Sequence, residues 1–205
     1  MKTYQYILIF TFCILCYCSN YEITQKSISF DAVKNEVVLK SDLKLDGNKG
    51  IWSYKGKPFN GFAARYYGNG RKAEFVGFYN GKKEGVAKQW FANGRARKIC
   101  YYKKNVLVAD YTTFWSNGNK AYHVTYNQNG KRNGLETSWW ADGKLSKKRN
   151  LSNGKENGLQ KAWLQNGKLY VNYEAKEGRI FGMRRANSCY NLKEETVIKY
   201  EDYKN

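Results

Sequence analysis

The sequence has one proline, Pro58, and one histidine, His123, among its 205 residues. A single imidazole excludes histidine-rich metal sites, and it leaves Ser-His-Asp or Cys-His catalysis only if His123 is the base. No G-x-x-x-x-G-K-[ST] phosphate loop occurs, and the glycines lack the strand-to-helix context of a dinucleotide-binding fingerprint. We therefore expect a non-enzymatic protein without a cofactor or a metal.

Long hydrophobic runs are also lacking, except near the N-terminus, where about a dozen apolar residues follow Lys2. This run is shorter than the ~20 residues that cross a bilayer, so residues 1–18 are predicted to be an export signal. Leu15, three residues before Cys18, resembles a bacterial lipobox and predicts lipidation of Cys18 and a lipid anchor in the cell envelope. Tyr17 departs from the small residue usual there. The alternative is signal-peptidase cleavage at Cys16-Tyr17-Cys18, which would give a secreted or periplasmic protein.

What the sequence has is a repeat. An aromatic residue and a second large residue recur, followed by a turn that ends in Asn-Gly or Asp-Gly. The last glycines of these turns are at positions 70, 94, 118, 143 and 167, so the spacings are 24, 24, 25 and 24. The large pairs are Tyr66-Tyr67, Trp90-Phe91, Phe114-Trp115, Trp139-Trp140 and Trp163-Leu164. Such a fixed period indicates a repeat array rather than a conventional domain.

Two further markers recur in phase with these turns. A second turn is expected at each of Gly81, Asn105, Gly130, Gly154 and Gly178, and a third marker closes each unit at Gly61, Gly85, Ala109, Gly134, Gly158 and Gly182. Because Asn and Gly tolerate positive φ, each unit is predicted to hold two turns and two strands of about five to seven residues. The expected fold is all-β, an elongated antiparallel meander of ~24-residue β-hairpin repeats in a single twisted or curled sheet.

The array occupies residues 51–185. Residues 19–50 are predicted to supply a tether and capping strands, around Val37-Val38-Leu39 and Leu43-Lys44-Leu45, and residues 186–205 a C-terminal cap or tail. Cys100 and Cys189 lie almost four repeats apart. At about 10 Å per repeat they are too distant for a disulfide, so we expect two free thiols.

The paired large residues predict two ladders of rings, because neighbours on a strand point to opposite faces. One ladder can form the core. The other would be a partly exposed binding surface that includes Tyr67, Phe91, Trp115 and Trp140.

The formal net charge is +19, which favours anionic partners. Basic residues are predicted to line one edge of the sheet at about 10 Å intervals, namely Lys82, Lys83, Lys103, Lys104, Lys131 and Arg132. They either bind an anionic membrane surface or keep the sheet edge soluble. Carboxylates such as Glu74, Glu84 and Glu136 are expected to be solvated.

The unit G-x-x-x-x-aromatic-aromatic-x-N-G-x(10)-G-x-x-x-G resembles the MORN-repeat variant of bacterial proteins, in arrays often labelled as antitoxin components of toxin-antitoxin systems. The resemblance covers about two thirds of the chain, in five full copies and a half copy that ends at Gly61. Similar arrays serve as membrane-associated scaffolds, protein-binding modules or appendages of enzymes. Together with the export signal, the resemblance leads us to expect a scaffold or protein-interaction module in the envelope, with another protein as partner. Two alternatives stay open: a binder of anionic lipid or another polyanion, and an antitoxin-like partner of a toxin. Nucleic acid is not a partner we expect.

Overall fold

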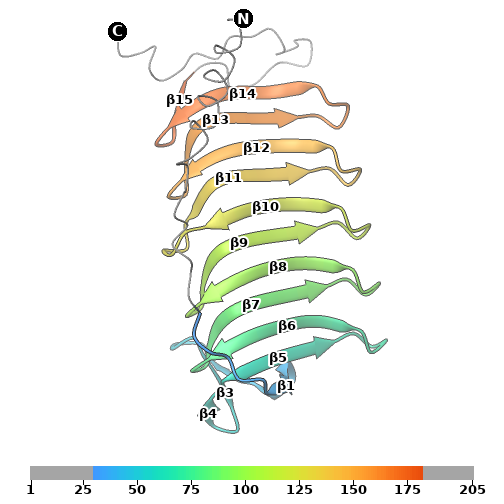
Figure 1. The fold of residues 1–205 in the computed structure, drawn as a ribbon, viewed down its shortest axis with the longest axis vertical. Coiled ribbons are helices and arrows are strands. Elements are labelled where there is room, and N and C mark those ends of the chain that lie inside the picture. The colour runs from blue at the N-terminus through green and yellow to red at the C-terminus, as the bar shows by residue number, and fades with distance from the viewer. Residues whose placement is uncertain (1–29, 182–205) are drawn as a thin grey trace, which may run out of the picture.

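The structure is a computed structural model that describes residues 30–181. These residues form a long single-layer sheet with a small second sheet at one end (Figure 1). The all-β antiparallel meander predicted from the repeat is confirmed. Cys18, Cys189 and the predicted tail at 186–205 lie outside the described residues. Among residues 30–181 no helix has the length and apolar character needed to cross a membrane.

Twelve strands form the long sheet, and from β5 onward each strand pairs with its neighbours in chain order. Nine of them, β6 to β14, have seven to nine residues each, and all except β10, which has seven, are longer than the five to seven residues predicted. The bounds are β1 Val37–Leu39, β5 Gly61–Tyr66, β6 Lys72–Tyr79, β7 Lys82–Trp90, β8 Ala96–Lys103, β9 Val106–Phe114, β10 Lys120–Tyr126, β11 Arg132–Trp139, β12 Leu145–Ser152, β13 Lys155–Trp163, β14 Leu169–Lys176 and β15 Arg179–Phe181.

The two predicted turns of each repeat lie at opposite edges of the sheet and differ in kind. The first is a three-residue loop in which, for example, Tyr67 N–H bonds Arg71 O, Gly70 N–H bonds Tyr67 O, and Gly70 has φ of 77°. We name this side the loop edge; its loops protrude on the right of Figure 1. The second is a two-residue turn with positive φ at both residues, as at Asn80-Gly81, which suits the strand twist. We name this side the turn edge.

One unit departs from this scheme. Between β10 and β11 the turn edge carries a wider loop, in which Asn127 N–H bonds Lys131 O and Gly130 N–H bonds Asn127 O. This is the unit in which the glycine spacing is 25 instead of 24.

The third glycine marker does not end a strand, and this explains the greater strand length. Gly85, Gly134 and Gly158 lie inside β7, β11 and β13 with φ of 69°, 86° and 103°. The pairing register with the preceding strand shifts beside each of them. They are therefore β-bulge positions, where a left-handed residue lets the strand continue. Ala109 holds the equivalent position in β9 with φ of 56°.

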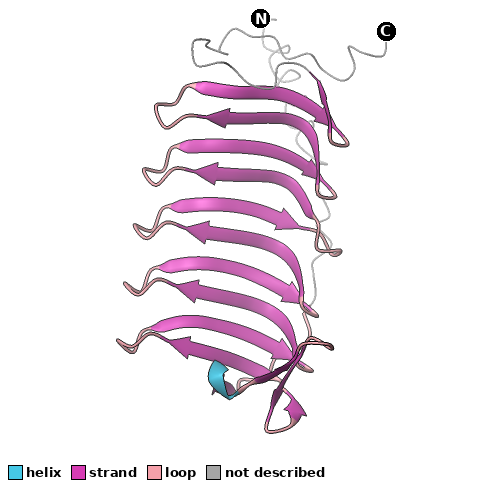
Figure 2. Ribbon diagram, turned by 180° about the vertical axis from the view of Figure 1, so that it is seen from behind, coloured by secondary structure: helices cyan, strands magenta, loops and turns pink. Residues whose placement is uncertain are grey.

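A small sheet of β2 (Lys44–Asp46), β3 (Ile51–Tyr54) and β4 (Lys57–Pro58) covers the first repeats, after the short 3-10 helix Lys40–Asp42. Figure 2 shows this cover at the lower end of the array. Trp52 and Phe59 each lie 5.9 Å from the ring of Phe78. We name the side of the long sheet that carries Phe78 the cap face, and the other side the back face. β1 pairs in parallel with β5 and so covers the first strand of the array.

The core lies at the strand centres of the cap face and not in the ring ladders. Buried residues there include Val76, Phe78, Ala87, Cys100 and Val124. None of the ten paired large residues of the repeat is buried, so the prediction that one ring ladder forms the core is wrong. The second residue of each pair belongs to a loop and not to a strand, so it cannot pack against the sheet centre.

Candidate binding surface

The paired large residues lie at the loop edge, where they join successive repeats. Tyr67 Oη donates to Trp90 O at 2.7 Å, and Trp115 Nε1 donates to Trp139 O at 3.0 Å. Phe91 and Trp140 begin the equivalent loops. These rings therefore have a structural role, yet Trp115 remains 40% exposed, which leaves part of its surface for a partner.

A hollow of about 590 Å³ lies beside Trp115, and we name it the aromatic hollow. Gln89, Lys98 and Thr113 occupy paired positions on β7, β8 and β9 at its floor. Its aromatic and basic lining is Phe91, Tyr111, Phe114, Trp115, Arg97 and Lys98. It adjoins the region that the small sheet covers, because Tyr111 packs against the core beneath that sheet.

The two basic residues of the aromatic hollow keep their charge available. Arg97 lies over the ring of Phe91, with 5.8 Å from the guanidinium carbon to the ring centroid. Neither Arg97 nor Lys98 forms an ion pair with a residue in the described part of the chain. Aromatic residues and arginine are enriched at protein–protein interfaces, whereas lysine is depleted there.

The predicted basic row lies at the turn edge, whereas the paired rings lie at the loop edge, at the other end of the strands. Lys82, Lys103, Lys104 and Lys131 are in or next to the turns there. Lys83 instead places its ammonium 5.1 Å from the ring centroid of Tyr102, and burial lowers its pKa. Arg132 donates to Glu136 at 2.8 Å. These two side chains turn inward from the row.

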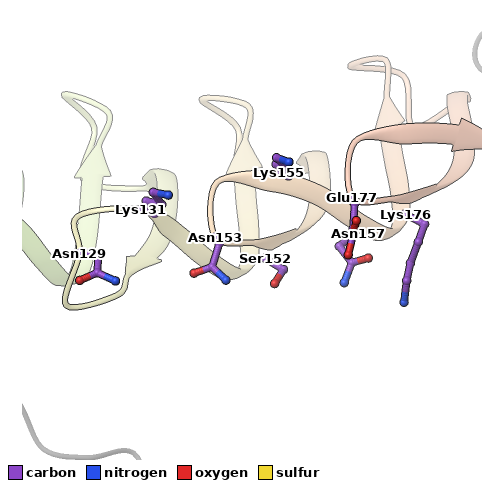
Figure 3. A pocket seen from close by; sticks show the side chains of 8 residues that line it. All are labelled: Asn129, Lys131, Ser152, Asn153, Lys155, Asn157, Lys176 and Glu177. Atoms are coloured by element: carbon purple, nitrogen blue, oxygen red, sulfur yellow. The ribbon is translucent and has the colours of Figure 1, made fainter.

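The turn edge has a hollow of its own, of about 540 Å³, between successive turns of the last repeats. Figure 3 shows its lining, in which the amides of Asn129 and Asn153 point to the same side, whereas Lys131 and Lys155 lie on the other side of the ribbon. The predicted rings and the predicted basic row therefore do not form one site. They are separated by the length of a strand, which is roughly 25–30 Å for nine residues.

Several carboxylates expected to be solvated are buried. Glu84 is 1% exposed and accepts the backbone N–H groups of Asp31 and Lys104 at 3.0 and 2.8 Å. Glu136, also 1% exposed, accepts from Tyr122 at 2.7 Å and pairs with Arg132 and Arg149. The expectation was wrong because most of their partners, such as Tyr122, Arg149 and Asp31, lie outside the strand that carries the carboxylate, and the repeat pattern does not reveal those contacts.

The pKa of Glu136 shows how strong these contacts are. Burial by itself would raise the pKa, but the hydrogen bonds from Tyr122 and Arg149 and the two arginine charges outweigh it, so the pKa is lowered below 4.5. Glu74 behaves in the same way. Burial opposes ionisation there, and the contacts with Lys40, Gln89 and Arg65 lower its pKa.

Other candidate residues show no catalytic arrangement. His123 is on the back face, with Nδ1 3.0 Å from Thr112 Oγ1 and Nε2 4.0 Å from Asp110 Oδ1. Cys100 is a buried free thiol whose pKa is raised by burial. Within residues 30–181 no three His, Cys, Asp or Glu side chains gather into a group that could hold a metal ion.

Comparison with known proteins leaves the class defined by the fold alone, an open array of β-hairpin repeats. No protein-family model matches the chain, and no curated protein matches it. Among solved structures, the chain is similar to S. aureus TarM, crystallised in complex with fondaparinux, alpha-GlcNAc-glycerol and UDP. The identity is 17% and the TM-score 0.30, over 57% of this chain and 21% of that chain. The chain thus spans about a fifth of the length of that protein, and a likeness at this level carries no functional argument.

Proposed function

We propose that this protein is a non-enzymatic scaffold of the cell envelope, lipid-anchored through Cys18, whose aromatic hollow binds a segment of another protein. The single observation behind the proposal is that aromatic hollow, in which Phe91, Phe114 and Trp115 stand beside the unpaired charges of Arg97 and Lys98. The partner segment has apolar or aromatic side chains next to Asp or Glu.

The chain's own packing supports this mode of binding. The small sheet already docks on the cap face through Trp52 and Phe59, so part of that face recognises polypeptide by ring packing. The aromatic hollow continues this surface beyond the small sheet. An interface with aromatic anchors needs few such residues, because a handful of central side chains supply most of the binding energy.

The test is affinity capture from the native envelope, followed by direct binding of the purified partner to the full chain. The double variant Arg97→Gln, Lys98→Gln removes both charges of the aromatic hollow and should weaken binding by about tenfold or more. The matched control is Lys148→Gln, on the back face of β12. Trp115→Ala should abolish capture, provided its circular dichroism spectrum matches that of the unchanged protein. Equal binding by all variants would contradict the proposal.

A second candidate function is favoured by the turn-edge hollow, with Lys131, Lys155 and Lys176 in its lining. There the ligand is a polyanion such as an anionic membrane surface. Binding would then fall steeply between low and high salt, and Lys131→Gln, Lys155→Gln would remove it while the aromatic-hollow variants kept it. The envelope anchor is tested separately, since Cys18→Ala should move the protein out of the membrane fraction and end fatty-acid labelling.

A further inference from the structure

The cap face holds a smaller hollow near its far end, of about 220 Å³, between β12, β13 and β14. Its lining residues include Lys147, Gln160, Ala162, Val171 and Tyr173. It is separate from the aromatic hollow on β7 to β10, and the argument below does not rest on the proposed function.

The amide of Gln160 is the unusual group in this smaller hollow. Gln160 is 1% exposed, and its Nε2 donates to Asn150 O at 2.9 Å and to Gly158 O at 3.0 Å. Because a backbone carbonyl only accepts, these two bonds fix which end of the amide is nitrogen. The other end, Oε1, is buried without a hydrogen-bond donor among the described residues. A buried acceptor without a donor is costly and calls for an explanation, of which a bound group that supplies the donor is one.

The basic residues at the smaller hollow differ in whether they already have an acidic partner. Arg149 is committed to Glu136 and Glu156, and Tyr173 Oη donates to Glu156 at 2.9 Å. Lys147 forms no ion pair in the part of the chain that the structure describes. Lys161 also borders the smaller hollow and forms no ion pair among the described residues, but it pairs with Lys148 in the ladder and so belongs to the back face. On the cap face the smaller hollow therefore offers one unpaired acceptor and one unpaired cation, Lys147.

These two groups are close enough to act on one small ligand. Arg149 pairs with Gln160 in the ladder and Lys147 pairs with Ala162, so Lys147 and Gln160 are diagonal neighbours on the cap face. Diagonal cross-strand neighbours lie about 7–8 Å apart. A ligand that satisfies both groups carries a hydrogen-bond donor and an anionic acceptor about one residue's length apart.

We infer that the smaller hollow captures the C-terminal end of a polypeptide. The last residue of a chain has its backbone N–H and its carboxylate on either side of one Cα. The N–H donates to Gln160 Oε1, the carboxylate accepts from Lys147, and the side chain rests on Ala162 and Val171. A volume of about 220 Å³ suits one small residue. Capture of a terminal carboxylate is a known way for proteins to recognise peptides.

The test compares two probes that differ only at the chain end, N-acetyl-Ala-Ala-Ala as the free acid and as its C-terminal amide. NMR titration of the full chain, as its host cell processes it, should show the acid shifting the Gln160 side-chain amide resonances. The amide should bind about tenfold more weakly or worse, since it loses a charge-assisted hydrogen bond.

Two variants localise the effect. Lys147→Gln should abolish the preference for the acid, whereas Lys148→Gln should keep it, because Lys148 is the next residue of β12 and is exposed on the back face. Equal binding of acid and amide, no binding of either, or an equal loss in both variants would overturn the inference.

Discussion

The two ends of the cap face bury their side chains by different means. At the first repeats, Val76, Phe78 and Ala87 lie beneath the small sheet in an apolar cluster. At the later repeats the same face has no cover among the described residues, and its centre holds Glu136 and Gln160. Glu136 is held there by its hydrogen bonds and ion pairs, and a buried polar group is stable where it is paired in this way. The later repeats therefore keep a buried centre without a covering sheet among the described residues.

The largest expected loss of stability comes from a substitution in the apolar cluster beneath the small sheet. Phe78 is fully buried between Trp52 and Phe59, so Phe78→Ala should leave a cavity and reduce the free energy of unfolding by about 3–5 kcal/mol. Denaturant unfolding measures the loss. Leu135→Ala is the control, since Leu135 is 46% exposed on the back face, and it should change stability by about 0.5 kcal/mol or less. Similar losses would mean that the small sheet is not a stabilising cover.

A smaller effect is expected at the open end. Glu136→Gln keeps the shape but leaves Arg132 and Arg149 without their shared carboxylate, and it should cost about 2–3 kcal/mol near neutral pH. Because the folded-state pKa of Glu136 is lowered, its stabilisation is present above about pH 4.5 and is lost as pH falls through the folded pKa. The stability difference between the two proteins should therefore shrink under acid, as followed by denaturant unfolding at several pH values. A difference that does not change with pH would contradict this account.

How much the sequence predicts differs between these two ends. The period and both turns follow from local chemistry, and even Lys104-Asn105 makes the expected turn without glycine, with φ of 49° and 74°. The prediction of the core is wrong because the largest rings of the repeat lie at the strand ends, whereas small residues such as Ala87 fill the strand centres. The Glu136 contacts could not be foreseen, since Arg149 is 13 residues away and at a position that the repeat does not mark. The repeat pattern therefore predicts the strands and turns of the array, whereas the contacts between side chains on different strands appear only in the structure.

The smallest effect concerns a row of asparagine hydrogen bonds along the loop edge, which begins at the covered end and is interrupted at Asp142. The asparagines of the loop edge form a ladder in which Nδ2 of each donates to a carbonyl one repeat on: Asn69 to Ala92, Asn93 to Ser116 and Asn117 to Ala141, at 3.2, 3.0 and 2.7 Å. The next position is Asp142, whose carboxylate side chain has no N–H to donate. Its side chain accepts from Lys144 N–H, and that bond, ahead of the Lys144 charge, lowers its pKa.

A second interruption of this ladder, closer to the covered end, should therefore lower the stability of the protein slightly. Asn93→Asp keeps the side-chain oxygen that accepts from Arg95 N–H but removes the donor to the next repeat, so we expect a loss of about 0.5–1 kcal/mol in thermal unfolding. Asp142→Asn should act in the opposite sense by supplying the missing donor. The two substitutions change the net charge in opposite directions. If Asn93→Asp raises the melting temperature and Asp142→Asn lowers it, side-chain charge and not the ladder controls the stability of this edge.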